Sequence, residues 1–108
     1  MVRQIHPTDV KAKLDAGEPL LLVDVRQPEE HALCRIEGSV LIPLGELTGR
    51  AGELDVPDGA TVVVYCHHGI RSLSGAALLT HAGIPNAVSM AGGIEAWSTL
   101  IDPAVPRY

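Results

Sequence analysis

Residues 61–72 read TVVVYCHHGIRS and contain the strongest predicted strand of the chain. Thr61 to Tyr65 are β-branched or aromatic throughout, a composition typical of a buried central strand. A polar segment with one glycine, residues 66–71, follows directly, and apolar residues at helical spacing then predict a helix over 72–81. The stretch therefore predicts a strand, a short loop and a helix, the unit from which parallel α/β sheets are built.

Further elements are predicted on both sides of this unit. An apolar run that ends in a charge indicates a buried strand at 20–25, and shorter runs indicate strands at 38–43 and 87–90. Helices are expected after a cap at Thr8, from about residue 27, at 44–51 and at 94–100. Residues 101–108 contain two prolines and are expected to extend over the surface. Alternating strands and helices predict an α/β fold with a parallel sheet and helices on both faces.

Composition narrows the class of protein. The chain has 108 residues, which fits one domain over residues 1–108, and 46% of them are apolar, with no Phe. The net charge is −5 and no basic run of four occurs, so a nucleic-acid partner is not expected. No apolar stretch is long enough to span a membrane and the start lacks a signal-peptide pattern. We therefore expect a cytoplasmic protein, in a reducing setting where free thiols persist.

Chemistry is expected at Cys66, because ligands of open parallel sheets bind beyond the carboxyl ends of the strands. Cys66 lies between a strand and a helix N-terminus, whose free N–H groups and partial positive charge favour an anion such as a thiolate. Gly69 permits backbone angles closed to other residues, so that loop amides can turn inward around the sulfur. Arg71 adds a fixed cation. The residues thus predict a ring of donors suited to a persulfide on Cys66 or to an incoming oxyanion.

The same residues also have purely structural interpretations. Free cysteines are often buried and inert, although the polar loop argues against this for Cys66. Adjacent Cys66, His67 and His68 cannot easily converge on one ion, so no metal is expected, and the two histidines are expected to line the pocket and add positive potential. Asp24, Arg26 and Glu30 are interpreted as a structural ion-pair group, with Arg26 as the candidate exception that binds substrate.

Cys34 is interpreted as a small buried residue, and a resolving thiol for Cys66 is the sharper alternative. Gly92 and Gly93 are interpreted as turn residues, and Trp97 as part of the core.

Three stretches resemble the rhodanese family, in order and at normal spacing. They are LVDVR (22–26) with the segments that follow it up to Pro43, VYCHHGIRS (64–72), and MAGGIEAW (90–97). The resemblance runs from about Ile5 to the end of the chain. It implies a five-stranded, mostly parallel sheet in a three-layer sandwich. Many family members have Gly-His where this chain has Cys34-Arg35, so no role is expected at that position.

The resemblance also implies a site. Cys66 would carry sulfur as a persulfide with Arg71 as the second catalytic residue, and the amides from His67 to Ser72 would cradle it. The residues expected to bind substrate are His67, His68, Gly69, Ile70, Ser72 and Arg26. The tail 101–108 is similar to the end of rhodanese domains fused to adenylyltransferases that activate sulfur carriers, which hints at a protein acceptor of sulfur.

The expected activity is a sulfurtransferase that moves sulfane sulfur from a small donor such as thiosulfate to a thiol, cyanide or a protein, without metal or organic cofactor. Two alternatives stay open. One is a phosphatase or arsenate reductase of the same fold, although that loop has five residues between Cys and Arg, and four separate Cys66 from Arg71 here. The other is a non-catalytic sulfur carrier or regulatory binding module.

Overall fold

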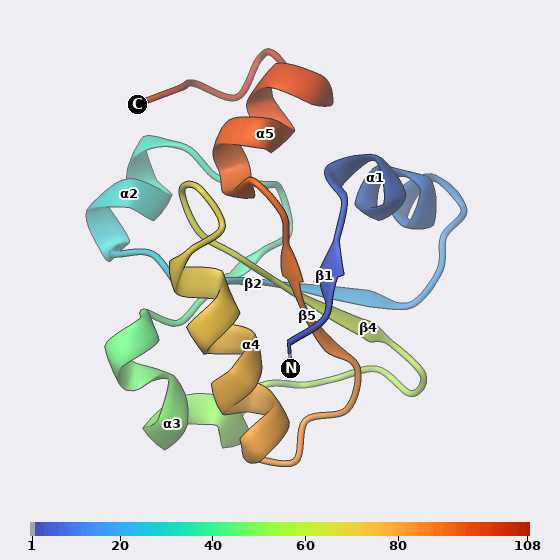
Figure 1. Cartoon of the computed structure of the whole chain (residues 1–108), viewed down its shortest axis with the longest axis vertical. Helices are drawn as coiled ribbons and strands as arrows, with labels where there is room; N and C mark the ends of the chain where they lie inside the picture. Colours follow the sequence, from blue (N-terminus) through green and yellow to red (C-terminus); the bar gives the residue numbers. More distant parts are fainter. Residues whose placement is uncertain (1) are drawn as a thin grey trace.

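A five-stranded parallel sheet forms the centre of the protein (Figure 1). The computed structural model describes residues 2–108. The spatial order of the strands is β1-β5-β4-β2-β3, and all four neighbouring pairs run parallel. The strands are β1 (Gln4–Ile5), β2 (Leu20–Asp24), β3 (Val40–Leu41), β4 (Thr61–Tyr65) and β5 (Ala87–Met90).

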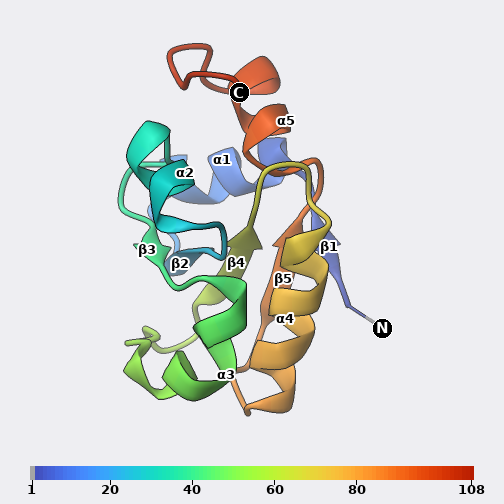
Figure 2. The same cartoon turned by 90° about the vertical axis from the view of Figure 1, so that its left-hand side faces the viewer.

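Helices cover both faces of the sheet (Figure 2), which confirms the predicted three-layer α/β architecture. The helices are α1 (Pro7–Asp15), α2 (Pro28–Leu33), α3 (Leu47–Arg50), α4 (Arg71–His81) and α5 (Gly93–Leu100), with 3₁₀ turns at Leu44–Glu46 and Ala51–Glu53. One core cluster joins the sheet to α1 and α5, and a second joins it to α3 and α4.

Strand β4 is the centre of both clusters. Residues 62–65 are fully buried, and they alternate between the faces: Val63 and Tyr65 pack with α5, whereas Val62 and Val64 pack with α4. Asp24 at the end of β2 pairs with Tyr65 at the end of β4. Because parallel strands end at the same edge, the chain leaves β2 toward Arg26 and leaves β4 toward Cys66 at neighbouring points.

The structure differs from the sequence-based elements at several boundaries. Strand β1 was not predicted from local pattern, because two residues carry no periodicity. Helix α1 is capped by His6, whose Nδ1 accepts from the Thr8 amide at 3.2 Å, so Thr8 is not the cap. The predicted strand 38–43 shortens to two residues, and the predicted helix 44–51 splits into a 3₁₀ turn and the short α3.

Among residues 2–108, no helix has both the length and the apolar character needed to cross a membrane.

Candidate functional site

The sulfur of Cys66 receives hydrogen bonds from two backbone amides. The amide of Gly69 donates to Sγ at 3.2 Å and the amide of Ser72 donates at 3.3 Å. Ser72 is the second residue of α4, so the positive end of an 11-residue helix faces the sulfur. Cys66 is only 1% exposed, and the loop shields the sulfur from bulk water. The arrangement favours negative charge on this atom.

Two glycines make this loop geometry possible. Gly69 has φ +91°, and a Cβ there would lie 2.9 Å from the amide nitrogen of Gly92. Gly93, with φ +62°, lies so close behind the loop that a Cβ would overlap the carbonyl oxygens of Cys66 and His67. The same carbonyls accept hydrogen bonds from the amides of Ile94 (2.8 Å) and Glu95 (3.1 Å). The N-terminus of α5 therefore holds the loop from behind.

A pair of buried serines extends from the sulfur. The Cys66 thiol donates to Ser72 Oγ at 3.5 Å, and Ser72 Oγ lies 2.7 Å from Ser89 Oγ. Both serines are fully buried, and Ser89 lies in β5 between apolar residues. The hydroxyls of Ser72 on α4 and Ser89 on β5 thus form one hydrogen-bonded chain with the sulfur of Cys66, which directly follows β4.

The Arg71 side chain is held by an acidic residue of α2. Its guanidinium forms a bidentate ion pair with the Glu30 carboxylate, at 2.7 and 3.0 Å. The hydrogen bonds from Arg71 hold the pKa of Glu30 well below its usual value, at about 2, and the same pair raises the pKa of Arg71. Arg71 therefore brings a cation to the edge of the Cys66 loop, but the structure places its guanidinium on Glu30 and not on the sulfur.

Arg26 does not have the geometry of a substrate-binding residue. Its side chain is fully buried and forms a bidentate pair with Asp24, at 2.9 and 2.8 Å. It also donates to the carbonyl of Cys34 at 2.6 Å and to the hydroxyl of Tyr108 at 2.9 Å. Burial opposes its charge, but these bonds outweigh that cost and raise its pKa. These contacts fit the structural interpretation of Asp24 and Arg26, and the full burial of Arg26 gives no support to the expectation that it binds substrate.

Glu30 was expected to join the ion-pair group of Asp24 and Arg26. It pairs with Arg71 at the candidate site and not with Arg26.

Aromatic rings stack beside the loop. His67 stacks on His68 with ring centroids 3.9 Å apart, and on Tyr108 with centroids 3.8 Å apart and planes 5° from parallel. Burial, and next the charge of His68, lower the pKa of His67. A lowered pKa favours the neutral imidazole of His67 over its charged form. Ile70 is 73% exposed at the outer side of the loop, where an incoming molecule can touch it.

Cys34 lies at the end of α2 with a free thiol that is 6% exposed. It packs in the core cluster on the α1 and α5 face, whereas Cys66 packs in the cluster on the other face. The sheet separates the two clusters, so this placement gives the resolving-thiol alternative no support. Within the described part of the chain, no group of three His, Cys, Asp or Glu side chains could hold a metal ion.

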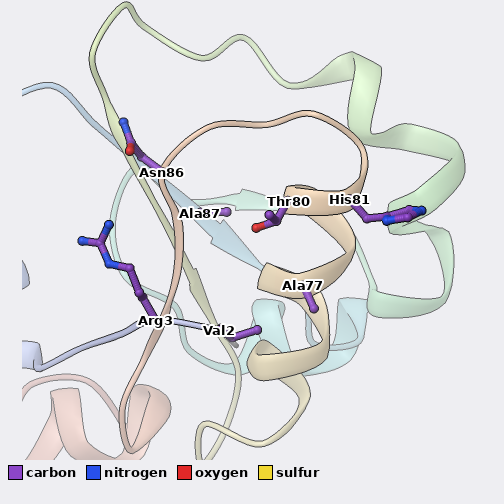
Figure 3. A pocket seen from close by; sticks show the side chains of 7 residues that line it. All are labelled: Val2, Arg3, Ala77, Thr80, His81, Asn86 and Ala87. Carbon is purple, nitrogen blue, oxygen red and sulfur yellow. The ribbon is translucent and has the colours of Figure 1, made fainter.

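A separate hollow of about 620 Å³ lies near the C-terminal end of α4 (Figure 3). The site described above lies at the opposite end of that helix. The lining side chains are mostly exposed, and none of them belongs to the Cys66 loop. They are Val2, Arg3, Ala77, Thr80, His81, Asn86 and Ala87.

Sequence reasoning missed three contributors to the site. Ser89 is a polar residue inside an otherwise apolar strand. This pattern indicates a buried hydroxyl that needs a hydrogen-bond partner, and it could have identified Ser89 as a site residue. Gly93 was interpreted as a turn, and its close approach to the loop depends on how α5 packs. Tyr108 had no local signal, because its partners Glu30 and Arg26 lie 78 and 82 positions earlier in the chain.

Fold and site together define a parallel α/β protein with a cysteine held between the end of its central strand and the N-terminus of a helix. The rhodanese-like domain family matches residues 6–100. The chain belongs to that family.

Relatives and solved structures agree with this assignment. A sulfurtransferase from Allochromatium vinosum is 34% identical over 98 residues, which cover 91% of this chain and 90% of that protein. The human single-domain sulfurtransferase TSTD1 matches with a TM-score of 0.80 and 25% identity, covering 93% of this chain and 98% of that chain. Such names support sulfur transfer as the general class of activity.

A larger relative contains this domain as one part. The probable adenylyltransferase/sulfurtransferase MoeZ of Mycobacterium tuberculosis is 36% identical over 104 residues, which are 96% of this chain. The chain spans about a quarter (26%) of the length of MoeZ.

Proposed function

We propose that this protein is a sulfurtransferase that carries sulfane sulfur as a persulfide on Cys66, in one domain formed by residues 1–108. The observation that carries the proposal is the convergence of the Gly69 and Ser72 amides on Cys66 Sγ, at 3.2 and 3.3 Å. Preorganised backbone donors stabilise negative charge on sulfur without any reorganisation during the reaction. Arg71 adds positive potential at the edge of the loop, and the side chains of His67, His68 and Ile70 line the approach.

The proposed reaction is a double displacement. The Cys66 thiolate attacks the outer sulfur of thiosulfate, the S–S bond of the donor breaks, and sulfite leaves with the electron pair. The product is a Cys66 persulfide anion. A thiolate or cyanide then attacks the terminal sulfur, so that thiocyanate or a new persulfide leaves and the Cys66 thiolate returns. Charge and atoms balance in both steps, and ping-pong kinetics are expected.

The short loop from Cys66 to Arg71 favours transfer of a sulfur atom over transfer of a phosphoryl group. Four residues separate Cys66 from Arg71, and both donating amides already lie within hydrogen-bond distance of Sγ. A terminal sulfur atom needs less room than a tetrahedral phosphate or arsenate. A protein thiol is a candidate acceptor, in keeping with the larger relatives named as adenylyltransferase/sulfurtransferases.

Intact-protein mass spectrometry after incubation with thiosulfate tests the proposal. The wild type should gain one sulfur atom, and cyanide should remove it with release of thiocyanate. Cys66→Ser should gain none and lose all transferase activity with its fold intact, whereas Cys34→Ser should behave as the wild type. Transferase activity that survives in Cys66→Ser would end the proposal, and phosphate-ester turnover lost in Cys66→Ser would establish the phosphatase alternative.

A further inference from the structure

The last residue of the chain reaches the candidate site. In Figure 1 the C-terminal segment runs back from α5 toward α2. The Tyr108 hydroxyl donates to Glu30 Oε2 at 2.7 Å and accepts from Arg26 Nη1 at 2.9 Å. Its ring lies flat on His67, with centroids 3.8 Å apart. One side chain thus contacts Arg26, Glu30 and the loop residue His67.

The path of the tail to this position is held at several points. The Ser98 hydroxyl donates to the carbonyl of Val105 (2.6 Å), and the Val105 side chain packs in the core cluster with Trp97. Arg107 pairs with Glu95 on α5. Because the segment is anchored on α5 before it ends, the placement of Tyr108 follows from the packing of the tail.

Tyr108 acts on two side chains of the candidate site, on Arg71 through Glu30 and on His67 directly. It orders Glu30, whose carboxylate in turn holds the Arg71 guanidinium in a bidentate pair. It also fixes the His67 ring by stacking. The hydroxyl is suited to this bridge because burial, the largest effect, raises its pKa to about 12, so that it stays protonated and can donate to Glu30.

We propose that Tyr108 is a positioning residue for the anionic sulfur donor, acting through Glu30 on Arg71 and directly on His67. This inference rests on the proposed sulfurtransferase function. Donor binding depends on the side chains around the loop, whereas sulfur release depends on the amides of Gly69 and Ser72, which Tyr108 does not touch. Loss of Tyr108 therefore weakens donor binding and leaves the rate at saturation nearly unchanged.

Steady-state kinetics with varied thiosulfate and fixed cyanide separate these effects. Tyr108→Phe keeps the ring on His67 and loses the hydroxyl, and we expect KM for thiosulfate to rise about threefold to tenfold. Tyr108→Ala loses both contacts and should raise KM further. Arg50→Ala, which removes an arginine of α3 whose ion pairs with Glu46 and Glu53 involve no residue of the site, is the control and should keep the wild-type KM. In each case kcat should stay within about twofold of the wild type.

A double variant tests the route through Glu30. If Tyr108 acts through that carboxylate, Tyr108→Phe should add little to the KM of Glu30→Gln, so the two changes are not additive. Melting curves identify any variant that fails to fold. If Tyr108→Ala does not fold, the KM of Tyr108→Phe alone decides the test.

Three results would overturn the inference: a wild-type KM in both Tyr108 variants, an equal rise in Arg50→Ala, or a Tyr108→Ala variant with higher kcat/KM than the wild type. The mass measurement on the wild type comes first. Absence of persulfide there would sink the proposed function itself, while a wild-type persulfide with unchanged Tyr108 variants would sink only the role of Tyr108.

Discussion

At Cys66, several donors converge on a single sulfur atom. The amides of Gly69 and Ser72 donate to it directly, and the Ser72 hydroxyl lies within reach at 3.5 Å. Ser89 has a fully buried side chain whose partner is the Ser72 hydroxyl. A buried hydroxyl is costly unless it is hydrogen-bonded, so this pair has a structural reason to stay together. When the sulfur is a thiolate, Ser89 can donate to Ser72 and Ser72 can donate to the sulfur.

This chain of hydroxyls gives a prediction for cysteine reactivity. In Ser72→Ala, iodoacetamide alkylation of Cys66 at pH 7 should slow by about threefold to tenfold, because the thiolate loses a hydrogen bond. Ser89→Ala should slow it by less. The alkylation rate is followed by mass spectrometry in a Cys34→Ser background.

Thr80→Ala is the control, because it removes a hydroxyl of the same helix that bonds to the carbonyl of Ala76 and not to the site. An unchanged alkylation rate in Ser72→Ala, or an equal decrease in Thr80→Ala, would contradict the expected role of the hydroxyl pair.

At the scale of elements, the loop is held between two helix N-termini. Helix α4 faces the sulfur, and the first amides of α5 bind the carbonyls of Cys66 and His67. Different peptide groups of one loop are thereby satisfied on two sides: the amides of Gly69 and Ser72 turn toward the sulfur, and the carbonyls of Cys66 and His67 turn toward α5. Gly93 allows α5 to approach this closely because it has no side chain.

Substitution of Gly93 should therefore separate the loop from its support. We expect Gly93→Ala to lower the free energy of unfolding by about 3 kcal/mol or more, since it adds a positive-φ penalty to an overlap with backbone. Gly83→Ala is the matched control: its φ is also positive, +91°, but nothing lies within 4 Å of its Cβ position. It should cost only about 1–2 kcal/mol. Urea denaturation followed by circular dichroism measures both, and equal costs would refute the close-contact explanation.

At the scale of the whole molecule, polar contacts tie together segments that are distant in sequence. The ion pair of Glu30 and Arg71 joins α2 to α4, and Tyr108 adds the C-terminal segment to the same cluster. Two apolar clusters hold the sheet to its helices, while this polar group joins the elements at the carboxyl edge of the strands. The site is therefore coupled to the stability of the fold.

That coupling predicts a pH dependence. The pKa of Glu30 is lowered from its usual 4.5 to about 2, first by the hydrogen bonds from Arg71. A lowered pKa means that the stabilisation is present above about pH 4.5 and is lost as the pH falls toward 2. The wild type should be more stable than Glu30→Gln at pH 7, and the difference should shrink toward zero near pH 2.

Urea denaturation at a series of pH values measures this difference. Glu29→Gln, at an exposed position on the same turn of α2, is the control and should not reproduce the trend. A difference between wild type and Glu30→Gln that stays constant from pH 6 to pH 2 would contradict the assigned ion pair.

Much of the fold was predictable from local pattern. The apolar run at 61–65, the run at 20–25 and the helix that follows Arg71 depend on periodicity and on side-chain shape, which a sequence displays directly. The loop from Cys66 to Ser72 was also recognisable, because a strand, a glycine and a helix start meet within a few residues. Order along the chain then indicated a parallel sheet, since strands joined by helices must cross over.

The tertiary structure decided what surrounds that loop. Arg26 is buried against Asp24, and Arg71 is held by Glu30. Tyr108, at the far end of the sequence, contacts Arg26 and Glu30. Such contacts join residues that share no local pattern, and they depend on how helices and tail pack over the sheet. That packing sets the hydrogen-bond partners of buried polar groups. The sequence alone therefore determined the Cys66 loop as a candidate site, and the folded chain determined which side chains lie next to that loop.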